Sequence, residues 1–171
     1  MANYIVNGDF SQDLEGWRNI ENHAEVKVEG AAGARYAAFV ANAQLTQARS
    51  VAVPRTLKFS MDIEVGGGSG EISTGIQIII GYTDAGQPHF NGFAVREFAT
   101  WQKAEIDLDL GVGEGTVDFV VWFIVQPNFT KPVSITNILL EDSVGPCGRN
   151  STRKLNNPVA PENLNQLLAK A

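Results

Sequence analysis

The chain has 171 residues, a formal net charge of −6 at pH 7 and a pI of about 4.9. This length suits one domain with its own hydrophobic core. The acidic balance argues against a nucleic-acid-binding surface, because phosphate binding needs clustered lysine and arginine side chains. A single cysteine, Cys147, excludes an intrachain disulfide.

The apolar runs of the chain bear on its location. The N-terminus shows no basic segment followed by an apolar run, so the sequence predicts no signal peptide. This leaves the location open between the cytoplasm and release as part of an assembly. No window approaches the roughly 18 apolar residues that a membrane span needs, so no membrane span is expected.

The chain opens with a polar turn and two aromatic residues after an apolar start. Asn7-Gly8-Asp9-Phe10 is followed by Gly16-Trp17. Further on, strands are expected where apolar and polar residues alternate, since successive side chains of a strand point to opposite faces. The expected strands are 24–29, 36–40, 43–53, 57–65, 75–83, 98–110, 116–125 and 133–142. The segment 87–93 is expected to be a polar and aromatic loop.

Two of these strands are apolar on both faces. In 75–83, Ile78 and Ile80 lie on one face and Ile79 lies on the other. In 116–125, Phe123 lies on one face and Trp122 lies on the other. Such strands are covered on both faces, or one face carries a ligand groove. A tryptophan on the solvent side of a strand whose other face is already apolar needs an explanation.

The pattern as a whole predicts an all-β fold. Many short strands separated by turn signals, with no helical run, indicate a β-sandwich of two antiparallel sheets over residues 1–142. Residues 143–171 form a basic tail with a net charge of +3, against −9 for the rest. In the tail, Pro161 fits the start of a short helix with a stripe of Leu164, Leu167 and Leu168.

Four segments in this order resemble the galactose-binding-like jelly rolls, in particular the carbohydrate-binding modules of families four, nine, sixteen and twenty-two. They are residues 7–17, Leu45-Thr46-Gln47, Thr100-Trp101-Gln102 and residues 135–142. The resemblance covers residues 3–142. It implies a jelly roll that binds an oligosaccharide or polysaccharide without catalysis. It also implies that Trp17 and Trp101 are core residues.

The resemblance further implies a structural calcium ion between the N-terminal segment and the final strand. Its ligands would be Asp9, Asn137 and Asp142. Ser11 and Asn137 stand where the family usually has acidic residues. This weakens or removes the site, because calcium prefers several carboxylate and carbonyl oxygens. The alternative is that Asp9 caps a turn.

Sugar binding in such modules combines aromatic rings that stack on sugar faces with polar side chains that reach the hydroxyls. The expected site is the face opposite the core. Its candidate residues are Trp122, Asp118, Gln77, Lys58 and Asp62, with His89, Phe90, Asn91 and Arg96 closing one end. The alternative is that a loop or the tail covers Trp122.

No catalytic pattern stands out. The two histidines, His23 and His89, form no metal-binding spacing, and no Ser-His-acid order with a nucleophile elbow occurs. We therefore predict that the protein is not an enzyme. A second hypothesis is a structural or assembly protein, which uses the jelly roll as a scaffold. It would dock on another copy of the chain or on a larger particle through residues 159–171.

Overall fold

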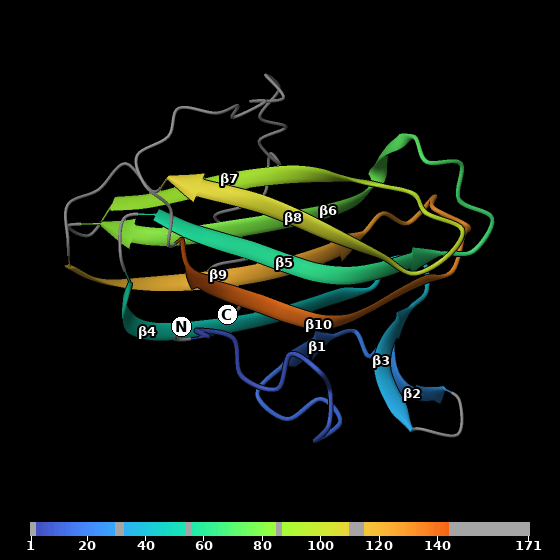
Figure 1. Cartoon of the computed structure of the whole chain (residues 1–171), viewed down its shortest axis with the longest axis horizontal. Coiled ribbons are helices and arrows are strands. Elements are labelled where there is room, and N and C mark those ends of the chain that lie inside the picture. The colour runs from blue at the N-terminus through green and yellow to red at the C-terminus, as the bar shows by residue number, and fades with distance from the viewer. Residues whose placement is uncertain (1–2, 30–32, 54–55, 85–86, 110–114, 144–171) are drawn as a thin grey trace.

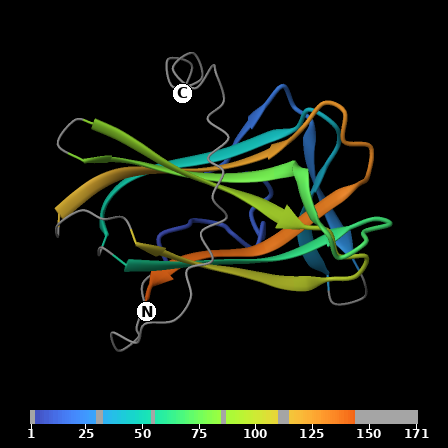
Figure 2. The same cartoon turned by 90° about the horizontal axis from the view of Figure 1, so that it is seen from above.

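The computed structural model describes residues 3–29, 33–53, 56–84, 87–109 and 115–143. These residues form ten β-strands in two antiparallel sheets of five strands each, which Figure 2 shows as two layers. No helix occurs within these ranges. Accordingly, nothing in the described part of the chain is a helix of the length and apolarity that a bilayer crossing requires. The predicted all-β sandwich is confirmed.

The strands are labelled in Figure 1. They are β1 (Arg18–Ile20), β2 (Ala24–Glu29), β3 (Ala34–Phe39), β4 (Gln44–Val53), β5 (Thr56–Val65), β6 (Ile72–Asp84), β7 (Gln87–Arg96), β8 (Gln102–Asp109), β9 (Gly115–Val125) and β10 (Val133–Asp142). One sheet, here the β9 sheet, has the order β1-β4-β9-β6-β7. The other, the β10 sheet, has the order β2-β3-β10-β5-β8. Consecutive strands such as β4 and β5 lie in different sheets, as in a jelly roll.

The hydrophobic core lies between the two sheets. Phe59 and Ile63 point inward from β5, and Val121 and Phe123 point inward from β9. The alternation in the sequence therefore identifies the inner face of both strands. Each such large side chain contributes about 1.5–3 kcal/mol through its removal from water.

Two strands differ from the sequence-based expectation. The segment 87–93 is part of strand β7, which pairs with β6 from Gln87 to Arg96. Because β7 is an edge strand with one unpaired side, it tolerates Pro88. The short strand β1 was not expected, since three residues are too few to show an alternation.

The N-terminal segment runs beside β10. The Tyr4 amide donates to the Leu140 carbonyl at 2.8 Å, and the Ile138 amide donates to the Gly8 carbonyl at 3.0 Å. A side chain at Gly8 would come within 2.1 Å of the Ile138 carbonyl oxygen. Glycine at this position therefore allows the opening segment to pack directly on the last strand.

Gln47 of β4 fastens the same segment to the β9 sheet. Its side chain is 2% exposed and accepts a hydrogen bond from the Val6 amide at 2.8 Å. Its amide group donates to the carbonyls of Val6 at 2.9 Å and Gly16 at 3.2 Å. The glutamine of the Leu45-Thr46-Gln47 motif thus has a structural role.

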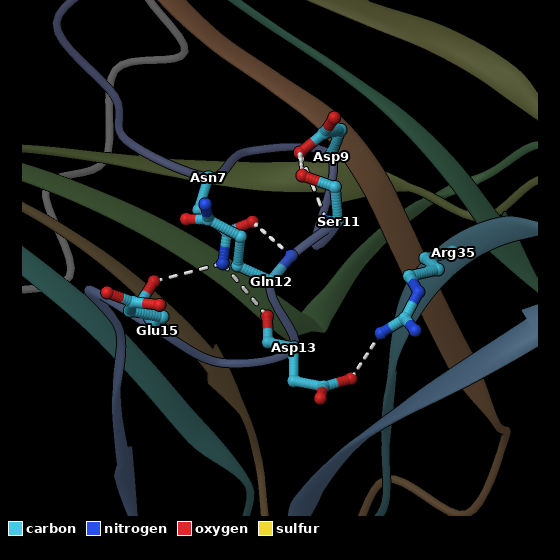
Figure 3. Close-up of polar contacts among 7 residues, drawn as sticks. All are labelled: Asn7, Asp9, Ser11, Gln12, Asp13, Glu15 and Arg35. Atoms are coloured by element: carbon cyan, nitrogen blue, oxygen red, sulfur yellow. Dashed lines mark hydrogen bonds and ion pairs between the residues drawn. The ribbon is translucent and has the colours of Figure 1, made fainter.

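Asn7 organises the turn that follows (Figure 3). Its amide nitrogen donates to the carbonyls of Asp13 and Glu15, each at 3.0 Å, and its amide oxygen accepts from the Gln12 amide at 3.0 Å. Its own carbonyl accepts a hydrogen bond from the Trp17 indole at 3.0 Å. The turn is therefore closed by side-chain hydrogen bonds.

The two motif tryptophans have different environments. Trp17 is a core residue, as expected, with its ring 5.8 Å from Phe10 and 5.9 Å from Phe123. Trp101 is half-buried on the outer face of the β10 sheet, so its expected core position is wrong. Its indole donates to Glu29 at 3.3 Å and meets the Tyr36 ring edge-on at 5.7 Å. Its place just before β8 gives it the parity of the outward-facing Lys103.

Candidate functional site

A row of three paired residues crosses the outer face of the β9 sheet. Trp122 of β9 lies opposite Thr46 of β4 on one side and Ile79 of β6 on the other. Paired residues of antiparallel strands share a face, and the neighbours of Trp122 along β9 point into the core. The row therefore faces outward. Even so, Thr46, Trp122 and Ile79 are only 7%, 5% and 4% exposed.

Three polar atoms on this face have no hydrogen-bond partner among the described residues. They are Gln44 Oε1, Thr46 Oγ1 and Trp122 Nε1, and all three are shielded from solvent. Buried polar groups in native proteins are nearly always paired, and each unpaired one costs about 1–3 kcal/mol. The three belong to the adjacent strands β4 and β9. This part of the face thus combines an indole N–H donor, an amide oxygen acceptor and a hydroxyl group that can both donate and accept.

Gln77 and Phe90 lie on the same face. Gln77 of β6 pairs with Ile124 in the row next to Trp122, and its amide donates to the Thr74 carbonyl at 3.4 Å. Phe90 is 37% exposed, and its ring lies over Gly81, where a Cβ atom would come within 2.8 Å of it. Glycine at position 81 thus leaves room for the ring. The sequence placed Gln77 on this face, whereas Phe90 was expected in a loop at one end of the site and instead lies on strand β7.

Other predicted site residues lie elsewhere. Lys58 and Asp62 project from β5, on the outer face of the other sheet, so they do not share a surface with Trp122. Lys58 forms an ion pair with Glu105 at 3.0 Å, and Asp62 accepts a hydrogen bond from Asn137 at 2.7 Å. The expectation that Lys58 and Asp62 share a face with Trp122 is therefore wrong. Alternation identifies the outward residues of a strand but not the sheet to which the strand belongs.

The residues expected to close one end are also divided. His89 and Asn91 alternate with Phe90 along β7 and therefore point to the opposite side of the sheet. The His89 ring stacks on Tyr82 at 5.0 Å. Arg96, near the end of β7, donates to the Gly70 carbonyl at 3.0 Å. The backbone of Asp118 lies in β9, and its side chain is outside the described part.

A polar cleft that the sequence did not indicate adjoins this face. It has a volume of about 510 Å³, within the ~300–1,000 Å³ usual for ligand pockets. It is lined by Ser73, Thr74, Gly75, Gln77, Glu97, Gln126, Asn128 and Phe129. Gln77 belongs to both the cleft and the outer face. No local pattern could have identified the cleft, because its lining comes from three separate segments of the chain.

Comparison with known proteins places this fold. No family model and no curated protein matches the sequence. Among solved structures, a family 16 carbohydrate-binding module matches 82% of this chain and 100% of its own, with 19% identity and a TM-score of 0.58. A family 61 module, TmCBM61, solved with β-1,4-galactotriose, matches 83% of this chain and 99% of its own, with 16% identity and a TM-score of 0.55.

The chain has the fold of the β-sandwich carbohydrate-binding modules. Modules of families 4 and 22 match as well, so three of the four families expected from the sequence are found. A similar fold occurs in part of the enzymatically active domain of tailspike protein 4 of bacteriophage CBA120. There the match covers 81% of this chain and 21% of the tailspike chain, with 13% identity and a TM-score of 0.63.

The three residues that the resemblance implies as calcium ligands, Asp9, Asn137 and Asp142, are engaged in other hydrogen bonds. Asp9 accepts hydrogen bonds from the amide and hydroxyl of Ser11 at 3.2 and 3.0 Å, which is a turn cap (Figure 3). Asn137 donates to Asp62, and Asp142 accepts from the Tyr4 hydroxyl at 2.5 Å. Within the described ranges, no three His, Cys, Asp or Glu side chains are grouped to hold a metal. Since calcium takes 6–8 oxygen ligands, these residues do not fit it.

Proposed function

We propose that the chain is a non-catalytic protein that binds a glycan on the outer face of the β9 sheet. The observation that carries this proposal is the group of unpartnered polar atoms around Trp122. Sugar hydroxyls both donate and accept hydrogen bonds, and the C–H faces of sugar rings are apolar. An indole beside Thr46 and Gln44 is complementary to both features.

The burial of Trp122 affects how a glycan would bind. Because Trp122 is 5% exposed, a sugar reaches its ring only when the groups that shield it move aside. Phe90 and Gln77 are already accessible at the surface and would make the first contacts. Interface side chains commonly change rotamer on binding, so this displacement is within the ordinary range.

The acidic residues support a role in binding rather than hydrolysis. Glycosidase chemistry uses a pair of carboxyl groups on either side of the glycosidic bond. The polar cleft contains one carboxylate, that of Glu97. On the outer face of the β10 sheet, Glu105 is paired with Lys58 and Lys103. The solved modules of the same fold include one with β-1,4-galactotriose and one joined to a xylanase with xylohexaose.

A glycan array with two matched variants tests this function. We expect the full chain to bind at least one oligosaccharide, and Trp122→Phe to weaken that binding at least ten-fold. Trp101→Phe changes the same residue type on the opposite sheet and should leave binding unchanged. Binding to no glycan would refute the proposal, as would equal binding by the Trp122→Phe variant.

A second candidate function is assembly. The observation that favours it is the presence of this fold within a bacteriophage tailspike. The docking segment predicted at residues 159–171 lies outside the described residues, while β10 ends at Asp142, the last residue of the predicted domain. Light scattering of the full chain and of a chain ending at Asp142 tests self-assembly. If only the full chain forms an oligomer, this function is favoured. If the full chain and the shortened chain are both monomeric, self-assembly through the tail is excluded.

A further inference from the structure

The polar cleft beside the β9 sheet has the composition of a sugar site. Amide side chains come from Gln77, Gln126 and Asn128, and hydroxyl groups come from Ser73 and Thr74. Amides and hydroxyls each donate and accept, which matches the dual capacity of sugar hydroxyl groups. One ring, that of Phe129, supplies an apolar surface. Polar groups that converge around one aromatic ring are typical of small-molecule sites.

The walls of the cleft are held by backbone hydrogen bonds. The Gln126 amide donates to the Gly75 carbonyl at 2.8 Å, and the Phe129 amide donates to the Gln126 carbonyl at 3.0 Å. The Phe129 ring packs on Gly75, where a Cβ atom would come within 2.2 Å of it. Glycine at position 75 therefore permits the ring to lie against β6. A pre-formed cleft loses little conformational entropy when a ligand binds.

Glu97 is the charged group of the cleft. Its side chain is largely buried, and its carboxylate is paired with the Lys131 ammonium. The hydrogen bond from Lys131, and a weaker contribution from Ser73, hold the pKa of the Glu97 carboxyl below its usual range. The carboxylate is therefore ionised at neutral pH and acts only as an acceptor. A ligand in the cleft meets a negative charge whose neutralising partner is already engaged.

The cleft is continuous with the Trp122 row through Gln77. Gln126 directly follows the end of β9 and lies four residues beyond Trp122, a distance of roughly 13 Å at about 3.3 Å per strand residue. Gln77 pairs with Ile124 between these two positions. A glycan lying along the strand from Trp122 would thus reach the cleft with a sugar unit further along its chain.

We propose that this cleft is a subsite for one neutral sugar ring of the bound glycan, with Gln126 and Asn128 binding its hydroxyls and Glu97 accepting from them. This inference rests on the proposed glycan-binding function and adds the class of ligand. An anionic sugar is disfavoured, because its carboxylate would approach Glu97 without a free cation in the cleft lining. The chain outside the tail also carries a net negative charge, which repels anionic polymers.

Calorimetric titration of the full chain tests the subsite. The probes are β-1,4-galactotriose and xylohexaose as neutral ligands and trigalacturonate as the anionic ligand. Asn128→Ala changes an exposed cleft residue and should weaken binding of a neutral probe about ten-fold, the loss of one or two hydrogen bonds. Gln102→Ala removes an exposed amide from the other sheet and should have no effect. Thermal melting verifies that both variants fold.

The outcomes separate the subsite from the proposed function. The subsite is supported if Asn128→Ala weakens the binding of a neutral probe, Gln102→Ala does not, and the wild-type chain binds trigalacturonate more weakly than the neutral probe. If Asn128→Ala binds the neutral probe as the wild type does and Trp122→Phe loses that binding, the subsite is overturned and the proposed function is retained. Trigalacturonate binding as tight as neutral binding overturns the ligand class. Failure of the wild-type chain to bind either neutral probe overturns the subsite, whereas the proposed function is overturned only when the chain binds no glycan on the array.

Discussion

Trp122 and Thr46 face each other across β9 and β4, and the polar atom of each side chain has no hydrogen-bond partner among the described residues. A fold selected only for stability would place apolar side chains at both positions, because each unmet buried group costs free energy. Violations of this kind are expected at functional sites. The pair therefore connects the stability of the β9 sheet to its proposed function.

Replacing Thr46 by valine should separate these two effects. Thr46→Val removes the unpaired hydroxyl with little change of shape, so we expect a gain of about 1 kcal/mol in the free energy of unfolding without glycan. The same variant should bind glycan more weakly, because a hydroxyl available to the sugar is lost. Urea unfolding and calorimetry measure the two quantities. A loss of stability would show that Thr46 Oγ1 has a partner, and unchanged affinity would remove Thr46 from the site.

Gln47 and Gln44 provide a matched pair on the two faces of β4. Gln47→Leu leaves the amide and carbonyl of Val6 and the carbonyl of Gly16 without their partner, so we expect a loss of about 2–4 kcal/mol in the free energy of unfolding. Gln44→Leu removes an unpaired oxygen and should change stability by less than about 0.5 kcal/mol or increase it. Urea unfolding of both variants measures the difference. Equal losses would contradict the clamping role of Gln47.

The fold follows from the sequence where the alternation is regular. Residues 57–65 and 133–142 predict β5 and β10 to within one residue, because one face of each is continuously apolar. Strand β7 was missed because its residues are polar and aromatic without alternation, and its conformation depends on pairing with β6. Trp101 was misplaced for a different reason, since its core position was taken from the family resemblance, whereas the alternation gives it the parity of the outward-facing Lys103.

Removal of calcium tests whether Asp9, Asn137 and Asp142 bind the ion. Because Asp9 caps Ser11 and Asn137 contacts Asp62, we expect chelation by EDTA to change the melting temperature by less than about 1 °C. A bound calcium ion at saturating concentration would instead raise it by about 5 °C or more. Thermal melts in EDTA and in millimolar calcium distinguish the two. A rise of the melting temperature in calcium would show that the protein does bind the ion that the resemblance implies.

Tyr4 should make the stability pH-dependent in alkali. Burial, together with the hydrogen bond to Asp142, raises the pKa of the Tyr4 hydroxyl to about 12. Because the folded pKa lies above the unfolded value of about 10, the stabilisation is complete below pH 10 and is lost as the pH rises towards 12. The stability difference between wild type and Tyr4→Phe should shrink over this range in urea unfolding. A difference that stays constant to pH 12 would contradict it.

The Asp142 carboxylate provides a check on the cause of this shift. Asp142→Asn removes the negative charge beside Tyr4 but keeps a side-chain oxygen, so the pKa of Tyr4 should fall towards its ordinary value while staying above it through burial. Ultraviolet absorbance of tyrosinate during an alkaline titration measures this. An unchanged titration curve would mean that Asp142 does not contribute.

The candidate site was predictable only in part. The parity of Trp122 and Gln77 placed them on an outer face, and both alternatives for Trp122, an exposed stacking ring or a covered one, follow from that parity. The structure shows a buried ring. Lys58 and Asp62 could not be assigned to a sheet from alternation, and Glu97, Gln126 and Asn128 come together only through the tertiary fold.

The indole N–H groups report most directly on glycan binding at Trp122. The Trp17 indole is bonded to the Asn7 carbonyl and the Trp101 indole to Glu29, whereas the Trp122 indole has no partner among the described residues. In a ¹H–¹⁵N spectrum, each of the three tryptophans gives a separate indole resonance, assigned with the Trp122→Phe and Trp101→Phe variants. On titration with a bound oligosaccharide, we predict a shift of the Trp122 resonance while that of Trp101 stays in place. A shift of Trp101 with an unmoved Trp122 would contradict glycan binding on the β9 sheet.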